Sequence, residues 1–358
     1  MKKLVNISII LSAFFIMGAG CVSLGGGNTS AGSAGMFVSI DKGQNWEAIS
    51  QYPTLNGVKQ LSDTSVFRLV TDPQNPKTFY WLSRERGLFY SYDEGNTWRQ
   101  DPGPLASGFV FGITIHPKDS CLLFGTNGER VYKTIDCGRI WTEMYRESRP
   151  GIQLAGVAFD PFNPEKIFAI ENNGDLLLSE DNGVSWRVTH RFGVSLSLIE
   201  FDHEEAGRMY LATRNRGIYR STDGGVTWGS LAHRMTDFPG ALDYRRFFIH
   251  PERSKTMYWV STYGILVSYD GGNNWQAIEL ITPPGSALIY GFAVNPKNDN
   301  EIYYTATINN RSTFYKSVDG GRNWITNKLP SGQVPTVLRV HPTREDILYL
   351  GFTLLPKQ

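Results

Sequence analysis

Seven aspartates recur in this sequence within one repeated motif, and their carboxylates are the groups best suited by type to bind a metal ion or to act as acids. The motif reads Ser or Thr, any residue, Asp, any residue, Gly, two further residues and Trp. Its aspartates are Asp41, Asp93, Asp136, Asp181, Asp223, Asp270 and Asp319. Its tryptophans are Trp46, Trp98, Trp141, Trp186, Trp228, Trp275 and Trp324.

One aspartate per copy is a poor basis for a metal site, because a calcium loop needs several carboxylates within about a dozen residues. A tight turn explains every invariant position. The Asp carboxylate accepts backbone N–H groups, the Ser or Thr hydroxyl holds the strand end, Gly supplies a positive φ angle, and Trp packs between neighbouring repeats. We therefore interpret the seven motifs as structural turns.

A second phrase recurs between the motifs: an apolar strand ends in Asp, His or Asn, usually followed by Pro and a polar turn. Its copies are Asp72-Pro73, His116-Pro117, Asp160-Pro161, the degenerate Asp202-His203, His250-Pro251, Asn295-Pro296 and His341-Pro342. His116, His203, His250 and His341 occupy equivalent turns in different repeats, so turn capping outweighs metal binding. No metal and no cofactor are expected.

The repeats predict an all-β fold, a seven-bladed β-propeller. The motifs recur about every 46 residues, the length of a four-stranded blade, and each repeat contains four short strands separated by turn signals. The chain opens with half a repeat, Gly35–Ser50, and closes with the complementary half, Thr336–Thr353. We predict that these halves pair in one composite blade, since ring closure removes open sheet edges. Gly112, Gly156 and Gly291 fall on innermost strands, where backbones crowd around the axis.

The N-terminal residues are typical of a processing signal. Lys2 and Lys3 precede an apolar stretch that is too short for a convincing membrane span, and small residues lead to Cys21. This order resembles a bacterial lipoprotein signal, in which the cysteine becomes the lipidated first residue, although Gly18 stands where such signals usually carry Leu.

These features divide the chain into three expected parts. Residues 1–20 are a signal peptide, residues 21–34 are the lipidated Cys21 and a flexible Gly- and Ser-rich tether, and residues 35–358 are the propeller. The protein is then expected to be lipid-anchored in the bacterial cell envelope, on the extracytoplasmic side of a membrane, facing the periplasm or the cell surface.

Two further cysteines, Cys121 and Cys137, flank one predicted hairpin. An exported chain meets oxidising conditions, and a turn near Thr126 to Glu129 brings the two strand ends together, which favours a disulfide over two buried thiols. The spacing lacks a second Cys pair or a nearby His pair, so zinc is not expected.

The charge balance argues against a general nucleic-acid binder. The chain has 35 basic and 34 acidic residues, for a formal net charge of +1, so electrostatic recognition must come from local patches.

The segment from Ser221 to Trp228 resembles the Asp-box, or BNR, repeats of bacterial sialidases, xyloglucanases, sortilin and the photosystem II assembly factors. The resemblance covers about residues 35–358. The chain is most similar in organisation to the photosystem II assembly factors, because it shares their blade number, export signal and basic loops. This resemblance implies a non-enzymatic propeller that holds a membrane-protein partner on an arginine-rich surface.

In a propeller the motif turns and the Pro turns share one face, so function is expected on the opposite face. Predicted hairpins and connections there carry the candidate partner-binding residues Arg84, Arg86, Arg146, Arg149, Arg191, Arg214, Arg216, Arg234 and Arg311. Guanidinium groups beside aromatic residues suit carboxylates, phosphates or an extended polypeptide. A protein partner, itself membrane-associated, is therefore the expected ligand; a solvated rim with no binding role is the alternative.

Enzymatic alternatives require two opposed carboxylates a few ångströms apart. Asp101, Glu147, Asp237 and Asp243 lie on the same predicted face, but no spacing pairs them. Sialidases of this family have six blades, and xyloglucanases place their cleft between two tandem propellers. The sequence therefore favours a protein that is not an enzyme, and leaves a carbohydrate-binding or glycoside-hydrolase-like propeller or a peptide receptor of the sortilin type as alternatives.

Overall fold

The computed structural model describes residues 32–354, so the expected signal peptide, Cys21 and most of the expected tether lie outside the described residues. The described chain is almost entirely β, with one short 3-10 turn, η1 (Ala232–Arg234). Within residues 32–354, no helix has the length and apolar character needed to cross a membrane.

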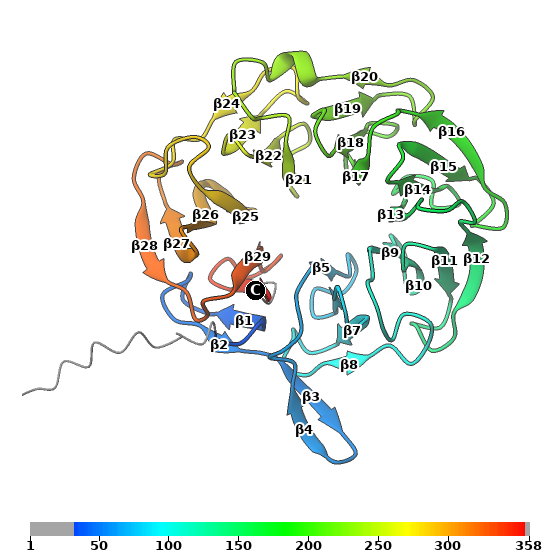
Figure 1. Ribbon diagram of the computed structural model, residues 1–358, viewed down its shortest axis with the longest axis horizontal. Coiled ribbons are helices and arrows are strands. Elements are labelled where there is room, and N and C mark those ends of the chain that lie inside the picture. Colours follow the sequence, from blue (N-terminus) through cyan, green and yellow to red (C-terminus); the bar gives the residue numbers. More distant parts are fainter. Residues whose placement is uncertain (1–31, 355–358) are drawn as a thin grey trace, which may run out of the picture. The chain divides into compact units, whose positions relative to one another are not determined.

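Seven four-stranded antiparallel sheets form the blades of a ring (Figure 1). Counted outwards from the axis, the first three blades contain β5 (Arg68–Thr71), β6 (Phe79–Leu82), β7 (Leu88–Ser91) and β8 (Arg99–Gln100); β9 (Gly112–His116), β10 (Asp119–Thr126), β11 (Arg130–Thr134) and β12 (Thr142–Arg146); and β13 (Leu154–Phe159), β14 (Ile167–Glu171), β15 (Asp175–Ser179) and β16 (Arg187–Arg191). The next three contain β17 (Leu196–Phe201), β18 (Met209–Thr213), β19 (Ile218–Ser221) and β20 (Gly229–Ser230); β21 (Tyr244–Ile249), β22 (Met257–Ser261), β23 (Ile265–Ser268) and β24 (Gln276–Ala277); and β25 (Leu288–Asn295), β26 (Asn298–Ile308), β27 (Arg311–Ser317) and β28 (Ile325–Lys328).

The seventh blade joins the two ends of the described chain. From the axis outwards it contains β29 (Val334–Val340), β30 (Leu348–Thr353), β1 (Gly35–Ser39) and β2 (Glu47–Ala48). β1 runs antiparallel to β30, and the register places Gly35 opposite Phe352. This pairing confirms the composite blade that the sequence predicts.

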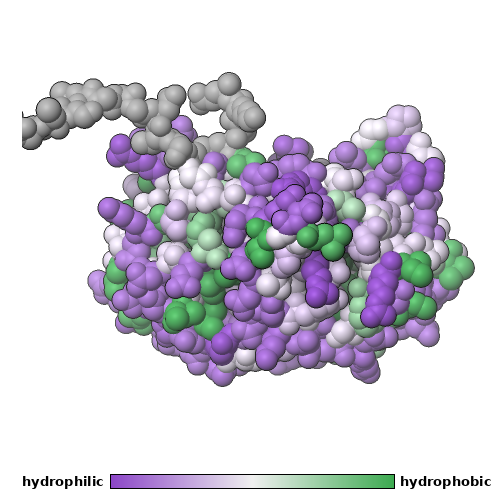
Figure 2. All heavy atoms as spheres, turned by 90° about the horizontal axis from the view of Figure 1, so that it is seen from below, coloured by the Kyte–Doolittle hydropathy of each residue, from purple (hydrophilic) through white to green (hydrophobic). Residues whose placement is uncertain are grey.

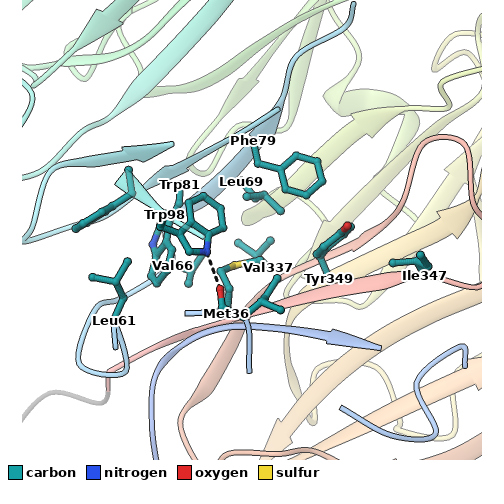
Figure 3. Close-up of a cluster of buried hydrophobic side chains, with 12 residues drawn as sticks. Met36, Leu61, Val66, Leu69, Phe79, Trp81, Trp98, Val337, Ile347 and Tyr349 are labelled. Carbon is teal, nitrogen blue, oxygen red and sulfur yellow. Dashed lines mark hydrogen bonds between the residues drawn. The ribbon is translucent and has the colours of Figure 1, made fainter. Parts of the chain in front are cut away.

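Each blade packs on its neighbour through buried apolar side chains. At the seam between the seventh and first blades, Trp98 is fully buried beside Trp81 and Met36 (Figure 3). The Trp98 and Trp81 rings meet edge to face with centroids 5.3 Å apart, and Trp98 Nε1 donates to the carbonyl of Ile49 at 2.6 Å. The last residue of this motif therefore locks two blades together.

The meander order gives the ring two distinct faces. In every blade the turn from the first to the second strand and the turn from the third to the fourth strand lie at the same end, which we call the box face. The hairpin between the second and third strands and the connection to the next blade lie at the opposite end, which we call the loop face. All seven repeated motifs and all seven Pro-type turns fall on the box face.

One connection carries an extra hairpin that the sequence analysis does not predict. β3 (Gln51–Thr54) pairs with β4 (Gly57–Gln60) and projects from the ring between β2 and β5 (Figure 1). Its tip residue Leu55 is fully exposed. On the side of the molecule seen in Figure 2, exposed apolar residues otherwise form small separate patches among polar ones.

The innermost strands crowd around the axis as expected. A Cβ on Gly112 would come within 3.1 Å of the Gly156 backbone, and one on Gly291 would come within 2.5 Å of Thr305 Oγ1. Five innermost strands also contain a bulge near their loop-face end, at β13, β17, β21, β25 and β29. A bulge removes backbone groups from the sheet ladder, so that they can form hydrogen bonds with other partners.

Candidate functional site

The seven motif turns share one hydrogen-bond pattern. In each, the Ser or Thr hydroxyl donates to the Asp carboxylate at 2.7–2.9 Å. The same carboxylate accepts the backbone N–H four residues later at 2.9 Å. Hydrogen bonds from Ser185 and Ser179 lower the pKa of Asp181 to about 2. Each of these carboxylates accepts at least two hydrogen bonds within its own turn, which leaves it unsuited to proton transfer.

The motif turn places two successive residues at positive φ, one more than the sequence pattern predicts. The invariant Gly has a positive φ, as expected, but so does the residue before it. In four copies that residue is not glycine: it is Lys42, Glu94, Cys137 or Asn182, with φ between 57° and 63°. The motif bonds therefore hold non-glycine residues in the left-handed region, a conformation that such residues adopt uncommonly.

The Pro-type turns use their Asp, His or Asn side chains as caps. His116, His250 and His341 each accept a backbone N–H from two residues later at Nδ1, at 3.1 Å. In the degenerate copy Asp202 accepts the N–H of Glu204 at 3.0 Å, so Asp202, not His203, is the equivalent residue. His203 stands in the Pro position of this equivalent turn, so the cap expected from the histidine is supplied by Asp202 instead.

The metal-binding possibilities on this face are correspondingly few. A ring nitrogen that accepts a backbone N–H is not free to bind a metal, and burial lowers the pKa of both His250 and His341. Within residues 32–354 no group of three or more His, Cys, Asp or Glu side chains is arranged to hold a metal ion.

Cys121 and Cys137 are joined by a disulfide. Their Cα atoms lie 3.9 Å apart, and the Cys137 N–H donates to the Cys121 carbonyl at 3.1 Å. The bridge ties the motif turn of the second blade to its second strand.

The strand topology brings all nine candidate arginines to the loop face, on four hairpins or connections and three strand ends. Arg84 and Arg86 lie between β6 and β7, Arg214 and Arg216 between β18 and β19, and Arg311 opens β27. Arg234 lies in η1, Arg149 follows β12, and Arg146 and Arg191 end the outer strands β12 and β16 rather than lying in loops.

These arginines divide into engaged and unengaged groups. Arg86 pairs with Asp63 at 2.5 Å, and Arg146 forms a bidentate pair with Glu143. Arg191 stands 3.7 Å from Asp175. The exposed members without an ion pair in the described chain are Arg84, Arg214, Arg216, Arg234 and Arg311. Arg84 instead stacks over Phe67 and Phe109, with its Cζ 5.1 and 5.4 Å from the ring centroids.

Arg149 is the most heavily engaged arginine. It contacts Glu147, Glu171 and Asp175 at 2.6–2.7 Å, and these three carboxylates are almost entirely buried. Burial, followed by the hydrogen bond with Glu147, raises the pKa of Glu171 to about 8, whereas the Arg149 guanidinium lowers the pKa of Glu147. We call these four residues the acidic nest; they join the second and third blades.

Two of the four candidate acids are engaged in structural hydrogen bonds. Asp101 is buried and accepts Trp141 Nε1 at 2.7 Å and the Gly103 N–H at 2.9 Å, while Glu147 lies under Arg149. Asp237 and Asp243 are exposed in the connection between the fourth and fifth blades. The buried members of the set thus serve inter-blade contacts.

The structure also brings together charged residues that the sequence analysis missed. Arg68, Arg246 and Arg339 lie on the innermost strands β5, β21 and β29, and Glu200 lies on β17. All four are at least partly exposed although they face the axis of the ring, so solvent reaches this region. The sequence signal that could have revealed them is a charged residue at a position next to a buried apolar residue of an innermost strand. We call these four residues the axial cluster.

The ring and its two faces define the class of this protein: it is a seven-bladed β-propeller of four-stranded blades. No known family model matches the sequence. The chain is 26% identical over 133 residues to Vacuolar protein sorting/targeting protein 10 of Emericella nidulans, which covers 35% of this chain and 9% of that protein.

Solved propellers are similar in fold. The GH74 xyloglucanase from Xanthomonas campestris gives a TM-score of 0.63 at 16% identity, covering 81% of this chain and 51% of that one. A structure of YCF48 bound to D1 peptide gives a TM-score of 0.58 at 14% identity, covering 82% of this chain and 94% of that one. This chain therefore spans about half of the xyloglucanase and nearly all of YCF48, and at these identities the likeness concerns the fold.

Proposed function

We propose that this protein is a non-enzymatic, lipid-anchored, extracytoplasmic scaffold that binds a protein partner on its loop face. The proposal rests on a difference between the two faces in whether their charged side chains have hydrogen-bond or ion-pair partners. Motif carboxylates on the box face are hydrogen-bonded within their turns, whereas five exposed arginines on the loop face have no ion pair in the described chain. Unpaired guanidinium groups beside aromatic rings are suited to acidic or extended polypeptide segments.

The path of the chain also favours the loop face as the binding surface. β1 begins at Gly35 and runs to the motif turn at Asp41, so the chain enters the ring at the loop-face end of the seventh blade. A tether from Cys21 to residue 34 would span at most about 45 Å when fully extended. A lipidated Cys21 would therefore keep the loop face within reach of the membrane and of a membrane-associated partner.

The non-enzymatic part of the proposal rests on accessibility. Two of the four candidate acids, Asp101 and Glu147, are buried and hydrogen-bonded, and glycoside hydrolysis needs two carboxylates that face the substrate together. The similar structure of YCF48 carries a D1 peptide, which is consistent with a propeller that binds polypeptide.

Capture of the partner tests the proposal. Tagged protein is purified from its own membranes as wild type and as Arg84→Glu, Arg214→Glu, Arg216→Glu and Arg311→Glu combined. We expect the combined variant to fold normally and to lose the partner, because four charges on one face are reversed. Arg139→Glu with Arg322→Glu reverses two exposed charges on the box face and is the matched control, with capture unchanged.

Two results would reject parts of the proposal. Equal capture by the loop-face and control variants would reject the loop face as the binding surface. Glycan turnover that is lost in Asp237→Asn or Asp243→Asn would reject the non-enzymatic assignment. A Cys21→Ser variant tests the anchor separately, since it should leave the membrane fraction while keeping its fold.

A further inference from the structure

We propose that the axial cluster is a binding site for an anionic oxygen group, a carboxylate or a phosphate, which enters from the loop face. The site lies on the ring axis and is formed by Arg68, Arg246, Arg339 and Glu200. None of its four residues belongs to the five exposed loop-face arginines, and it goes beyond the proposed function, since the ligand group need not belong to a protein.

Two of the arginines are held in place by backbone carbonyls of other blades. Arg68 Nη2 donates to the carbonyl of Ser197 at 3.1 Å, from the first blade to the fourth. Figure 1 shows β5 and β17, which carry these residues, on opposite sides of the axis. Arg246 Nη2 donates to the carbonyl of Thr336 at 2.8 Å, from the fifth blade to the seventh.

The accepting carbonyls belong to the bulges. Ser197 lies between the paired positions Leu196 and Leu198, and Thr336 lies between Pro335 and Val337. Because a bulged carbonyl is released from the sheet ladder, it can accept a hydrogen bond from the axis. These two bulges therefore orient the guanidinium groups of Arg68 and Arg246 before any ligand arrives.

The arginines keep most of their donors unused. A guanidinium has five N–H donors, of which Arg68 uses one in the described chain and Arg246 uses two, the second to the carbonyl of Arg245 at 3.1 Å. The Arg339 side chain makes no hydrogen bond or ion pair within the described residues. Planar forks of free N–H groups match the two or three oxygens of a carboxylate or phosphate.

The charge of the cluster is unbalanced. Three guanidinium groups face one carboxylate, and none of the three arginines forms an ion pair within the described residues. Burial and then the neighbouring Arg68 lower the pKa of Arg246, and burial raises the pKa of Glu200 to about 7. Like charges held close together repel one another, so an added anion offsets part of that cost.

The entrance carries two more arginines in fixed positions. Arg245 donates to Tyr290 Oη at 2.9 Å and stacks on that ring, and Arg84 lies over Phe67 and Phe109. The positive potential therefore extends from the loop face to the axis, and such an arrangement concentrates anions at its inner end.

Binding of inorganic phosphate and of acetate tests the site without any partner. Thermal unfolding and titration calorimetry are run at constant ionic strength, with chloride as the reference anion. We expect phosphate to raise the unfolding temperature in a saturable way, because a ligand that binds only the folded state stabilises it. Arg246→Gln and Arg339→Gln should each weaken phosphate binding about tenfold or more, since each removes charged donors.

Two further variants sharpen the test. Glu200→Gln removes the internal counter-charge and should tighten phosphate binding by roughly fivefold. Arg322→Gln on the box face should leave it unchanged. Arg339→Gln breaks no hydrogen bond in the described chain, so it keeps the test valid if Arg246→Gln fails to fold. No stabilisation beyond that of chloride, or equal binding by wild type and Arg339→Gln, would overturn the proposal.

A competition experiment then identifies the source of the anionic group. If phosphate displaces a captured partner and Arg339→Gln loses that partner, an acidic group of the partner occupies the site. If phosphate binds and capture is unaffected, a free anion is the ligand. Both outcomes support the site, and because phosphate binding is measured on the protein alone, its failure is distinguishable from failure of the loop-face proposal.

Discussion

The box face and the loop face are built from the same seven repeats and differ in how their charges are satisfied. On the box face each motif carboxylate is bonded within its own turn, with nearly identical distances in all seven copies. On the loop face the corresponding hairpins differ, and Arg84, Arg214 and Arg311 project without an ion pair in the described chain. A side chain whose hydrogen bonds are all local can stabilise the fold but has little left for a ligand.

The most conspicuous carboxylates of the sequence are hydrogen-bonded within their own turns, as the sequence predicts. The charged residues best placed for binding stand outside the repeat pattern. Changes on the box face should therefore affect stability without changing partner or anion binding. Changes on the loop face should affect partner or anion binding without changing stability.

The largest expected effect is loss of a motif tryptophan at a blade seam. Trp98→Ala should lower the free energy of unfolding by about 3–5 kcal/mol, because it leaves a cavity between the seventh and first blades and frees the Ile49 carbonyl. Urea unfolding measures the change. Trp324→Ala is the matched control, since that ring is only partly buried, and its smaller loss should separate burial from motif membership. Equal losses would contradict the seam argument.

A smaller effect is expected when one motif hydroxyl is removed. Ser91 is buried, donates to Asp93 at 2.7 Å and accepts the Gly95 N–H at 2.9 Å. Ser91→Ala leaves that buried N–H unsatisfied and should cost about 1–3 kcal/mol of unfolding free energy. The exposed Ser230→Ala is the control. Altered phosphate or partner binding in Ser91→Ala at full folding would break the division between the two faces.

A pH-dependent effect is expected from the acidic nest. Burial and Glu147 raise the pKa of Glu171 from 4.5 to about 8, so the folded protein holds a proton that the unfolded chain releases. The contribution of Glu171 to stability is therefore highest below about pH 4.5 and decreases as pH rises through about 8. Glu147 has a lowered pKa, and its contribution is lost in the opposite direction, as pH falls below its ordinary range.

Glu171→Gln checks this sign, because glutamine resembles the protonated acid and has no proton to release. Chemical unfolding between pH 5 and pH 8 should show wild-type stability falling relative to the variant as pH rises. Parallel pH profiles would show that Glu171 is ionised in the folded state as it is in the unfolded one. The exposed Glu204→Gln, far from the nest in sequence and blade, controls for the loss of one negative charge.

The ring was predictable because its determinants are local and repeated. The motif turn needs Ser or Thr, Asp and Gly at set spacing, and the two half-repeats, Gly35–Ser50 and Thr336–Thr353, leave pairing of the chain ends as the way to close the sheet. The hairpin β3–β4 was missed because it interrupts a connection that the repeat does not constrain. His203 lies in an equivalent turn without the expected capping role, because the cap comes from the residue before the Pro position.

The sequence alone determined the all-β class, the number of blades and the face that carries the structural turns, because these follow from short-range turn chemistry repeated along the chain. Only the tertiary structure decided which charges remain available. Arg149 and Glu171 are separated along the chain but meet at a blade seam, whereas Arg68, Arg246 and Arg339 meet on the axis. Ring closure brings residues from distant repeats within reach, and no local pattern specifies whether they meet an opposite charge or a like one.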